Sequence, residues 1–423
     1  MYAQVVEYDP PTILPLNSAQ AAAIQAAGAR WAKVLKLGPN PFEVEMTGAG
    51  CAIRARDVAG FLRIGDLSLD VIPKFLDPES AGPTWRRALW RFLAFAQGVD
   101  SVVVPTLGRE VDELGIADLL ADLFIASVGR GVLMGYPLGY QTQRRLSPFM
   151  IGRIDPRRAG RLAIPDGRLP IETKRLTRDT DLGRLLKWAG GELSRQVESR
   201  ERRGRLLAWT GGLSDISDTL PILLHRVSTS RQFPHLEVAA DIARMLLADH
   251  WGEYGNGALN LPGFLWRSET LFEKAMLRLT RQSAHPLGMT ADKRSHPLAI
   301  EDFGHDRRTV PTTPDIDVHR AGNSVVILDA KYKVLNRLPS ADDVYQVMSA
   351  GRVRGVRRVA LLYPSDGSGL QLRTLKPLGE GLPRTIDLIS VGFQSFESLA
   401  EVRLLKNKVT SWLRDSQQLQ ATA

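Results

Sequence analysis

Apolar residues recur in two distinct patterns along this chain. Spacings of three and four residues are typical of amphipathic helices, whereas strict alternation with intervening glycine turns is typical of short strands. Residues 31–75 show the strand pattern, and Pro73 fits a strand edge. The helical pattern covers the segments 17–30, 84–98, 116–136, 182–213, 240–254 and 263–284. The first of these begins at a capping Asn17 or Ser18 and is expected to end near Gly28.

The last third of the chain mixes both patterns. Residues 312–320 and 323–335 predict two strands joined by the turn HRAGNS, and residues 341–353 predict a helix. The apolar run at 358–364 predicts a buried strand. Two further strands are expected at 370–376 and 383–391. This order predicts an α/β sheet covered by helices.

These elements predict a multidomain α+β protein in three parts. Residues 1–80 form a β-rich N-terminal module, and residues 82–258 form a basic helical middle domain with an insertion at 143–182. Residues 261–415 form the C-terminal α/β domain. Residues 416–423 are expected to be a frayed polar tail.

Composition places the chain among folded proteins of the cytoplasm. It has 423 residues, of which 44% are hydrophobic and 24% charged, so the signature of disorder is absent. A single cysteine fits a reducing compartment. The N-terminus lacks the pattern of a signal peptide, and no apolar run approaches the ~20 residues that span a membrane. The sequence therefore predicts a cytoplasmic protein without a membrane segment.

The net charge of +9 comes from one region. Residues 141–210 contain 17 Lys and Arg against 8 Asp and Glu, and the rest of the chain is balanced. Such a cluster attracts a polyanion such as DNA, so DNA contacts are expected at Arg157, Arg158, Arg202 and Arg203. A solvated arginine face explains the same pattern about as well.

Several common catalytic motifs are missing. No G-x-x-x-x-G-K-[ST] loop occurs, so this chain should not hydrolyse a nucleotide through a P-loop. Neither G-x-G-x-x-G after a strand nor G-x-S-x-G is present, and the seven histidines lack the spacing of a zinc site. Carboxylates and lysines remain as the candidate catalytic groups.

One stretch, TPDIDVHRAGNSVVILDAKYK at 313–333, gathers these groups. Asp315 leads one strand and Asp329 ends the next, so a hairpin would bring the two carboxylates together. Asp329 and Lys331 lie two residues apart and share a strand face. Two converging carboxylates need a cation, and oxygen ligands suit Mg²⁺. A lysine beside that ion could orient a water and stabilise the negative charge on a phosphate group during its transfer.

This arrangement resembles the PD-(D/E)xK nuclease superfamily, which implies that Asp315 and Asp329 hold Mg²⁺ and that Lys331 assists the attacking water. These nucleases often carry a further acid on a flanking helix, and Glu273 occupies that place. Gln346 on the following helix could approach the site or the DNA. A second Pro-Asp…Glu-x-Lys stretch at 164–174 leaves too little chain for two paired strands, and it is treated as a coincidence.

Two alternatives concern the site itself. Asp329 could form an ordinary salt bridge with Lys331 or Lys333 at a strand end. Asp317 lies two residues after Asp315 and could replace it as metal ligand, although Asp315 has the position after proline.

Further stretches occur in an order that resembles the McrC family, the nuclease subunit of the 5-methylcytosine-specific McrBC restriction system. They are GFLRIGDLSLDVIPKF, LWRFLAFAQGVD, SPFMIGRIDPRR, DTDLGRLLKWA, LFEKAM and PDIDV…LDAKYK. The resemblance implies a Mg²⁺-dependent DNA endonuclease that stimulates a McrB-like AAA+ GTPase or ATPase ring. The N-terminal module would then contact that ring.

Two other functions fit the sequence less well. A non-catalytic DNA-binding adaptor could activate an AAA+ motor, but the intact Asp315, Asp329 and Lys331 disfavour it. A stand-alone DNA repair nuclease would leave some 260 residues before the nuclease domain without an evident role.

Overall fold

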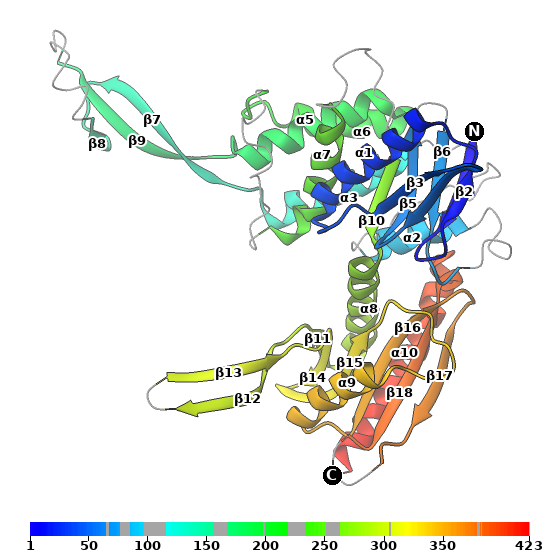
Figure 1. The fold of residues 1–423 in the computed structure, drawn as a ribbon. Coiled ribbons are helices and arrows are strands. Elements are labelled where there is room, and N and C mark those ends of the chain that lie inside the picture. The colour runs from blue at the N-terminus through cyan, green and yellow to red at the C-terminus, as the bar shows by residue number, and fades with distance from the viewer. Residues whose placement is uncertain are drawn as a thin grey trace. The chain divides into compact units, whose positions relative to one another are not determined.

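The computed structural model describes residues 1–64, 67–76, 85–96, 116–155, 167–197, 199–218, 233–250, 263–303, 306–378, 381 and 383–422. The chain forms two compact units (Figure 1). Unit 1 combines Met1–Glu113 with Asn260–Ala423, and unit 2 is Leu114–Leu259. In the described parts of the chain, no helix is both long and apolar enough to cross a membrane.

The N-terminal part of unit 1 contains two small sheets. One has the strand order β1-β6-β5-β10 and the other β2-β4-β3. The elements are β1 (Tyr2–Val6), β2 (Thr12–Leu14), α1 (Ser18–Leu35), β3 (Phe42–Thr47), β4 (Gly50–Ala55), β5 (Val58–Ile64), β6 (Leu67–Ile72), α2 (Trp85–Ala96) and β10 (Gly263–Arg267).

Two local predictions in this part are wrong. Helix α1 continues past Gly28 and ends at Lys36, which adopts a left-handed conformation with φ of 54°. Gly28 instead allows a close approach, because a Cβ there would collide with Asn40 and Phe42. Residues Gly263–Arg267 were expected to begin a helix, but they form β10, which pairs antiparallel with β5.

The C-terminal part of unit 1 is built on a six-stranded sheet of order β11-β14-β15-β16-β18-β17. A separate β12-β13 hairpin extends away from it (Figure 1). The elements are α8 (Ser268–Ala284), β11 (Thr290–Asp292), β12 (His296–Phe303), β13 (Asp306–Thr312), β14 (Ile316–Arg320), β15 (Asn323–Ala330), α9 (Ala341–Val353), β16 (Arg358–Ser365), β17 (Leu370–Leu375), β18 (Thr385–Gly392) and α10 (Leu399–Ala421). The strands and the helix predicted between residues 312 and 391 are confirmed.

Helices α9 and α10 cover opposite faces of this sheet. Ile386 and Leu388 of β18 pack in one core cluster with Val347 of α9. Asp387, which lies between them and therefore faces the other way, accepts a hydrogen bond from Trp412 Nε1 of α10 at 2.7 Å. Because Ile327 belongs to the α9 cluster, alternate residues along β15 also face α9.

The expected frayed tail is helical instead. Helix α10 runs to Ala421, and Ser416 is buried in it. The Gln420 side chain accepts a hydrogen bond from the Arg357 amide at 2.9 Å and donates one to the Gly355 carbonyl at 3.0 Å. Polar side chains at the end of the chain thus satisfy backbone groups of the loop before β16.

The expected boundary near residue 81 also differs from the structure. Helix α2 belongs to unit 1, where Phe92 and Phe95 contact Phe396, with ring centroids 4.8 and 5.2 Å apart. An apolar contact to the C-terminal part of the chain therefore decides where residues 85–96 belong.

Unit 2 is helical with a long β-hairpin. Its elements are α3 (Ile116–Met134), β7 (Gly139–Ser147), β8 (Arg153–Ile154), β9 (Leu169–Thr177), α5 (Asp181–Gln196), α6 (Arg200–Gly211), the 3-10 turn η4 (Pro234–Leu236) and α7 (Glu237–His250). The basic stretch at 143–182 was expected to be an insertion, and strands β7 and β9 pair over nine residues there. This hairpin extends away from the helices of its unit (Figure 1) and exposes Tyr140, Phe149 and Met150.

A buried polar contact joins the two chain segments of unit 1. The Tyr332 hydroxyl, just after β15, donates a hydrogen bond to Glu7 Oε2 at 2.7 Å, and both residues are buried. The Lys74 ammonium lies 4.4 Å from the centre of the Tyr332 ring. Burial raises the pKa of Glu7 from its ordinary 4.5 to about 7, against the opposing effects of Tyr332 and Lys74.

This shift makes the stability of unit 1 depend on pH. Between pH 4.5 and 7 the folded protein binds more protons at Glu7 than the unfolded chain does, so ionisation of Glu7 destabilises the fold as pH rises. Relative to Glu7→Gln, the wild type should lose about 3 kcal/mol of unfolding free energy across this window. Urea unfolding of both proteins at several pH values measures the difference. A difference independent of pH would contradict the assignment.

A second prediction concerns unit 2. Arg202 of α6 donates two hydrogen bonds to Asp122 of α3, at 3.0 and 2.8 Å, and its guanidinium lies 3.9 Å from Asp118. Arg202→Gln would leave the buried Asp118 and the mostly buried Asp122 without this partner and should cost about 3 kcal/mol of unfolding free energy. The matched control, Arg200→Gln, changes an exposed arginine on the same helix and should cost less than ~0.5 kcal/mol. Equal stability of the two variants, measured by urea unfolding, would disprove the structural role of Arg202.

Candidate functional site

The β14–β15 hairpin brings the two predicted carboxylates to one end of the sheet. Its strands are joined by Ala321 and Gly322, which both have positive φ, 50° and 86°. Such two-residue turns match the twist of antiparallel strands. Asp315 immediately precedes β14 and Asp329 is the next-to-last residue of β15. The Ala330 amide donates a hydrogen bond to Asp315 Oδ2 at 3.0 Å.

A bulge in β15 sets which residues meet. Next to the turn His319 pairs with Ser324, but beyond it Val318 pairs with Val326, so Val325 is one extra residue. Continued from Ile316 and Leu328, this register places Asp315 opposite Asp329. Without the extra residue Asp315 would lie opposite Leu328.

Asp329 is a buried carboxylate with a strongly shifted pKa. Its residue is 2% exposed, and it lies on the α9 face of the sheet, like Ile327. Burial raises its pKa to about 6, and the nearby Asp315 carboxylate adds to the rise, while Lys331 opposes it. A bound cation would favour the charged form of both carboxylates.

Lys331 is held beside Asp329 by groups of α9. Its Nζ lies 2.6 Å from Asp329 Oδ2 and donates a hydrogen bond to Gln346 Oε1 at 2.7 Å. Asp343 Oδ1 lies 3.8 Å away. The prediction that Asp329 and Lys331 share one face is confirmed. Gln346, expected near the site, contacts Lys331 directly.

The alternative that Asp329 forms an ordinary salt bridge with Lys331 or Lys333 agrees with the structure in part. Asp329 does pair with Lys331, whereas Lys333 donates to Asp343, at 3.0 and 3.1 Å. An ion pair at a strand end would not by itself require Asp315, which adds a second negative charge beside a buried carboxylate.

Glu273 approaches the same end of the hairpin from α8. Lys293, just after β11, lies between the two acids: its Nζ donates to Asp315 Oδ1 at 3.0 Å and is 3.6 Å from Glu273 Oε2. Burial raises the pKa of Glu273, and the charge of Asp315 adds to this effect. Sequence reasoning missed Lys293, because it belongs to no local motif and reaches the site only through the pairing of β11 with β14.

The donor set fits Mg²⁺ in one respect. Among the described residues no group of three His, Cys, Asp or Glu side chains is close enough to hold an ion. Mg²⁺ usually keeps several waters and binds through one or two carboxylates, so Asp315 and Asp329 meet its minimum requirement.

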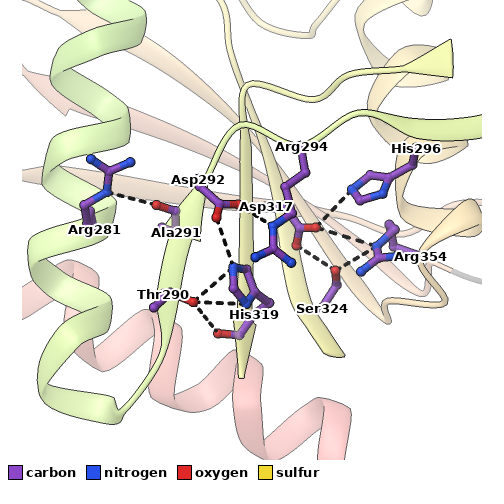
Figure 2. A network of polar contacts seen from close by, with 10 residues as sticks. All are labelled: Arg281, Thr290, Ala291, Asp292, Arg294, His296, Asp317, His319, Ser324 and Arg354. Carbon is purple, nitrogen blue, oxygen red and sulfur yellow. Dashed lines mark hydrogen bonds and ion pairs between the residues drawn. The ribbon is translucent and has the colours of Figure 1, made fainter. Parts of the chain in front are cut away.

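Asp317 belongs to a different contact network. It is fully buried, accepts a hydrogen bond from the Ser324 hydroxyl at 2.6 Å, and lies 3.1 Å from His296 Nε2 (Figure 2). Its two oxygens are thus engaged away from Asp329, and the structure favours Asp315 of the two candidate acids.

The arginines expected to contact DNA divide into two groups. Arg157 and Arg158 lie outside the described residues. Arg202 is 13% exposed in its side chain and is paired with Asp122, and Arg203 donates to the carbonyls of Ser194 and Val197 at 3.2 and 2.7 Å. The last two arginines therefore contact protein groups at the end of α5 and on α3, which explains their charge without DNA.

The second Pro-Asp…Glu-x-Lys stretch, at 164–174, also makes its contacts within unit 2. Glu172 lies in β9, where it forms an ion pair with Arg144 of β7 at 3.2 Å. Asp166 lies outside the described residues. Glu172 and Lys174 belong to unit 2, and the cluster around Asp329 belongs to unit 1.

The chain resembles known proteins in its sequence and in its fold. No curated protein matches the sequence. Over 97% of its length the chain resembles the whole of a chain in the Thermococcus gammatolerans assembly of McrB AAA+ hexamers with bound McrC, with 18% identity and a TM-score of 0.50. A chain of a second T. gammatolerans McrBC complex matches 67% of this chain over 88% of its own length, with 20% identity and a TM-score of 0.40. The family model described as McrBC 5-methylcytosine restriction system component matches residues 53–364, and the chain belongs to this family.

Proposed function

We propose that this chain is the McrC-type DNA endonuclease subunit of a McrBC-like restriction system, with a PD-(D/E)xK site that uses Mg²⁺. The observation that carries the proposal is the meeting of Asp315 and Asp329 at one hairpin end, with Lys331 held against Asp329. A purely structural ion pair would need only Asp329 and Lys331. The additional carboxylates of Asp315 and Glu273 create a local excess of negative charge that suits a divalent cation.

Each residue has a distinct role in this proposal. Asp315 and Asp329 would hold Mg²⁺, which supplies charge neutralisation at the phosphate and an activated water. Lys331, oriented by Gln346, would donate a hydrogen bond to that water or to a phosphate oxygen. Glu273 and Lys293 would set the charge around Asp315, since Lys293 contacts both acids.

We further propose a McrB-like AAA+ ring as the partner, because the similar T. gammatolerans assembly contains McrB AAA+ hexamers with bound McrC. The N-terminal module remains one candidate contact surface, and Ile13 and Met46 are exposed on it. The β7–β9 hairpin is a second candidate, because it exposes larger apolar side chains, Tyr140 and Phe149 among them.

DNA contact is proposed at Arg157 and Arg158. Arg202 and Arg203 are not proposed to contact DNA, since both contact protein groups in unit 2.

The function can be tested with methylated and unmethylated plasmid in the presence of Mg²⁺. Wild type should cut only together with the proposed McrB-like AAA+ partner and its nucleotide, and Asp329→Ala should lose at least about 10³-fold in rate, because a bound metal contributes several kcal/mol to transition-state stabilisation. Stimulation of the motor by Asp329→Ala should persist, which controls for folding.

Other outcomes of this assay would identify the alternatives. Cutting by Asp329→Ala would refute the site. Stimulation of the motor without cutting by either protein would favour a non-catalytic adaptor. Cutting without any motor would favour a stand-alone nuclease.

The metal site makes an independent prediction about stability. Folding raises the pKa of Asp329 to about 6, so its ionised form destabilises the metal-free protein at neutral pH. Asp329→Asn should therefore gain roughly 1–3 kcal/mol without metal and lose the stabilisation that millimolar Mg²⁺ gives the wild type.

Thermal unfolding with and without Mg²⁺ measures both effects. Asp342→Asn, which removes an exposed carboxylate in the first turn of α9, should keep the response to Mg²⁺. A wild type that does not respond to Mg²⁺, or an Asp329→Asn protein that responds equally, would argue against this metal site.

A further inference from the structure

A polar pocket lies at the turn end of the β14–β15 hairpin, opposite to the end that carries Asp315 and Asp329. It has a volume of about 520 Å³, within the range of small-ligand sites. Its walls come from the hairpin turn and from the C-terminal ends of α9 and α10. Its lining residues include Arg320, Asn323, Ser324, Arg354 and Gln417. Six residue steps along β15 separate Asn323 from Asp329, roughly 20 Å in an extended strand.

The lining is positively charged. The described residues that line it include Arg320 and Arg354 and no Asp or Glu. Arg320 is exposed, and no described residue forms a hydrogen bond or ion pair with its side chain. Asn323 and Gln417 add side-chain amides that can donate hydrogen bonds. Such a surface favours an anionic ligand over a neutral or cationic one.

Arg354 is fixed in place by the buried network around Asp317 (Figure 2). Its Nε donates a hydrogen bond to Ser324 Oγ at 2.9 Å and lies 3.6 Å from Asp317 Oδ2. Ser324 in turn donates to Asp317, whose other oxygen lies beside His296. One edge of the guanidinium is thus anchored to a fully buried carboxylate.

The other edge of the same guanidinium is available for binding. No described residue accepts a hydrogen bond from Nη1 or Nη2 of Arg354. A guanidinium whose orientation is already fixed loses little entropy on binding, and its paired N–H groups match the spacing of phosphate oxygens.

We propose that this pocket binds a phosphate group between Arg320 and Arg354. The phosphate could belong to bound DNA or to a free phosphate or nucleotide, since both present the same oxygens to the arginines. Asp317, Ser324 and His296 act as positioning residues that hold Arg354. The site is separate from the proposed cleavage centre and does not require that centre to be active.

Two measurements on the full-length protein test the proposal. The first follows the thermal unfolding midpoint during a titration with inorganic phosphate, with chloride at matched ionic strength as the reference. The second measures the affinity for a 30-base-pair duplex by fluorescence anisotropy in EDTA, over a range of salt concentrations. The variants are Arg320→Gln and Arg354→Gln. Arg352→Gln is the matched control, because Arg352 is exposed on α9 and does not line the pocket.

If the ligand is free phosphate, it should raise the unfolding midpoint of wild type and Arg352→Gln. Both pocket variants should then bind it roughly tenfold more weakly or worse. If the ligand is a DNA phosphate, each pocket variant should lower the slope of log affinity against log salt by about one. Both measurements are made without Mg²⁺, so neither depends on DNA cleavage. Their outcome therefore tests the pocket separately from the proposed nuclease function.

The proposal fails if Arg320→Gln behaves like wild type in both measurements. Among the described residues, no hydrogen bond or ion pair joins the Arg320 side chain to Asp317, Ser324, His296 or Arg354, so this variant should fold normally and reports on the pocket alone. An effect restricted to Arg354→Gln would show that Arg354 serves the fold and would also overturn the proposal.

Discussion

The register of β14 against β15 is the constraint on which the candidate site depends. The left-handed turn at Ala321 and Gly322 starts the pairing, and the extra residue Val325 then shifts it by one position. Only the shifted register places Asp315 opposite Asp329. Because side chains alternate between faces of a strand, a one-residue slip would also carry a buried carboxylate to the wrong side of the sheet. A single bulge near the turn thus determines the chemistry at the far end of the hairpin.

Each end of this hairpin holds a buried carboxylate, and the two ends balance that charge differently. Asp317, near the turn, is satisfied by Ser324 and His296, and Arg354 lies close by. Asp329, at the other end, has Lys331 beside it, but its pKa rises because it is buried and, to a smaller extent, because the Asp315 carboxylate lies close by. The first arrangement stabilises a fixed structure. The second leaves a charge imbalance that a ligand can correct, which is the usual character of a functional site.

Sequence reasoning succeeded where the decisive contacts are local. The turn and the alternating strands were enough to predict that Asp315 and Asp329 meet, because the two strands are adjacent in the chain. It failed where partners are distant. Residues 263–267 have helical spacing, but they pair with a strand near residue 60 and become β10. Arg202 was assigned to DNA on its charge, although its partner Asp122 lies 80 residues earlier. Lys293 reaches the site through an edge strand and has no motif to mark it.

The division of the chain also has a consequence for how the protein folds during synthesis. Unit 2 is one continuous segment, so it can fold as soon as it emerges from the ribosome. Unit 1 cannot: strand β5 must wait for β10, which follows it by about 200 residues. At ~5–20 residues per second this delay lasts on the order of ten to forty seconds. During that time β5 can pair with β6, but its other edge stays open and is exposed to chaperones and to aggregation. Tyr332 reaches Glu7 later still.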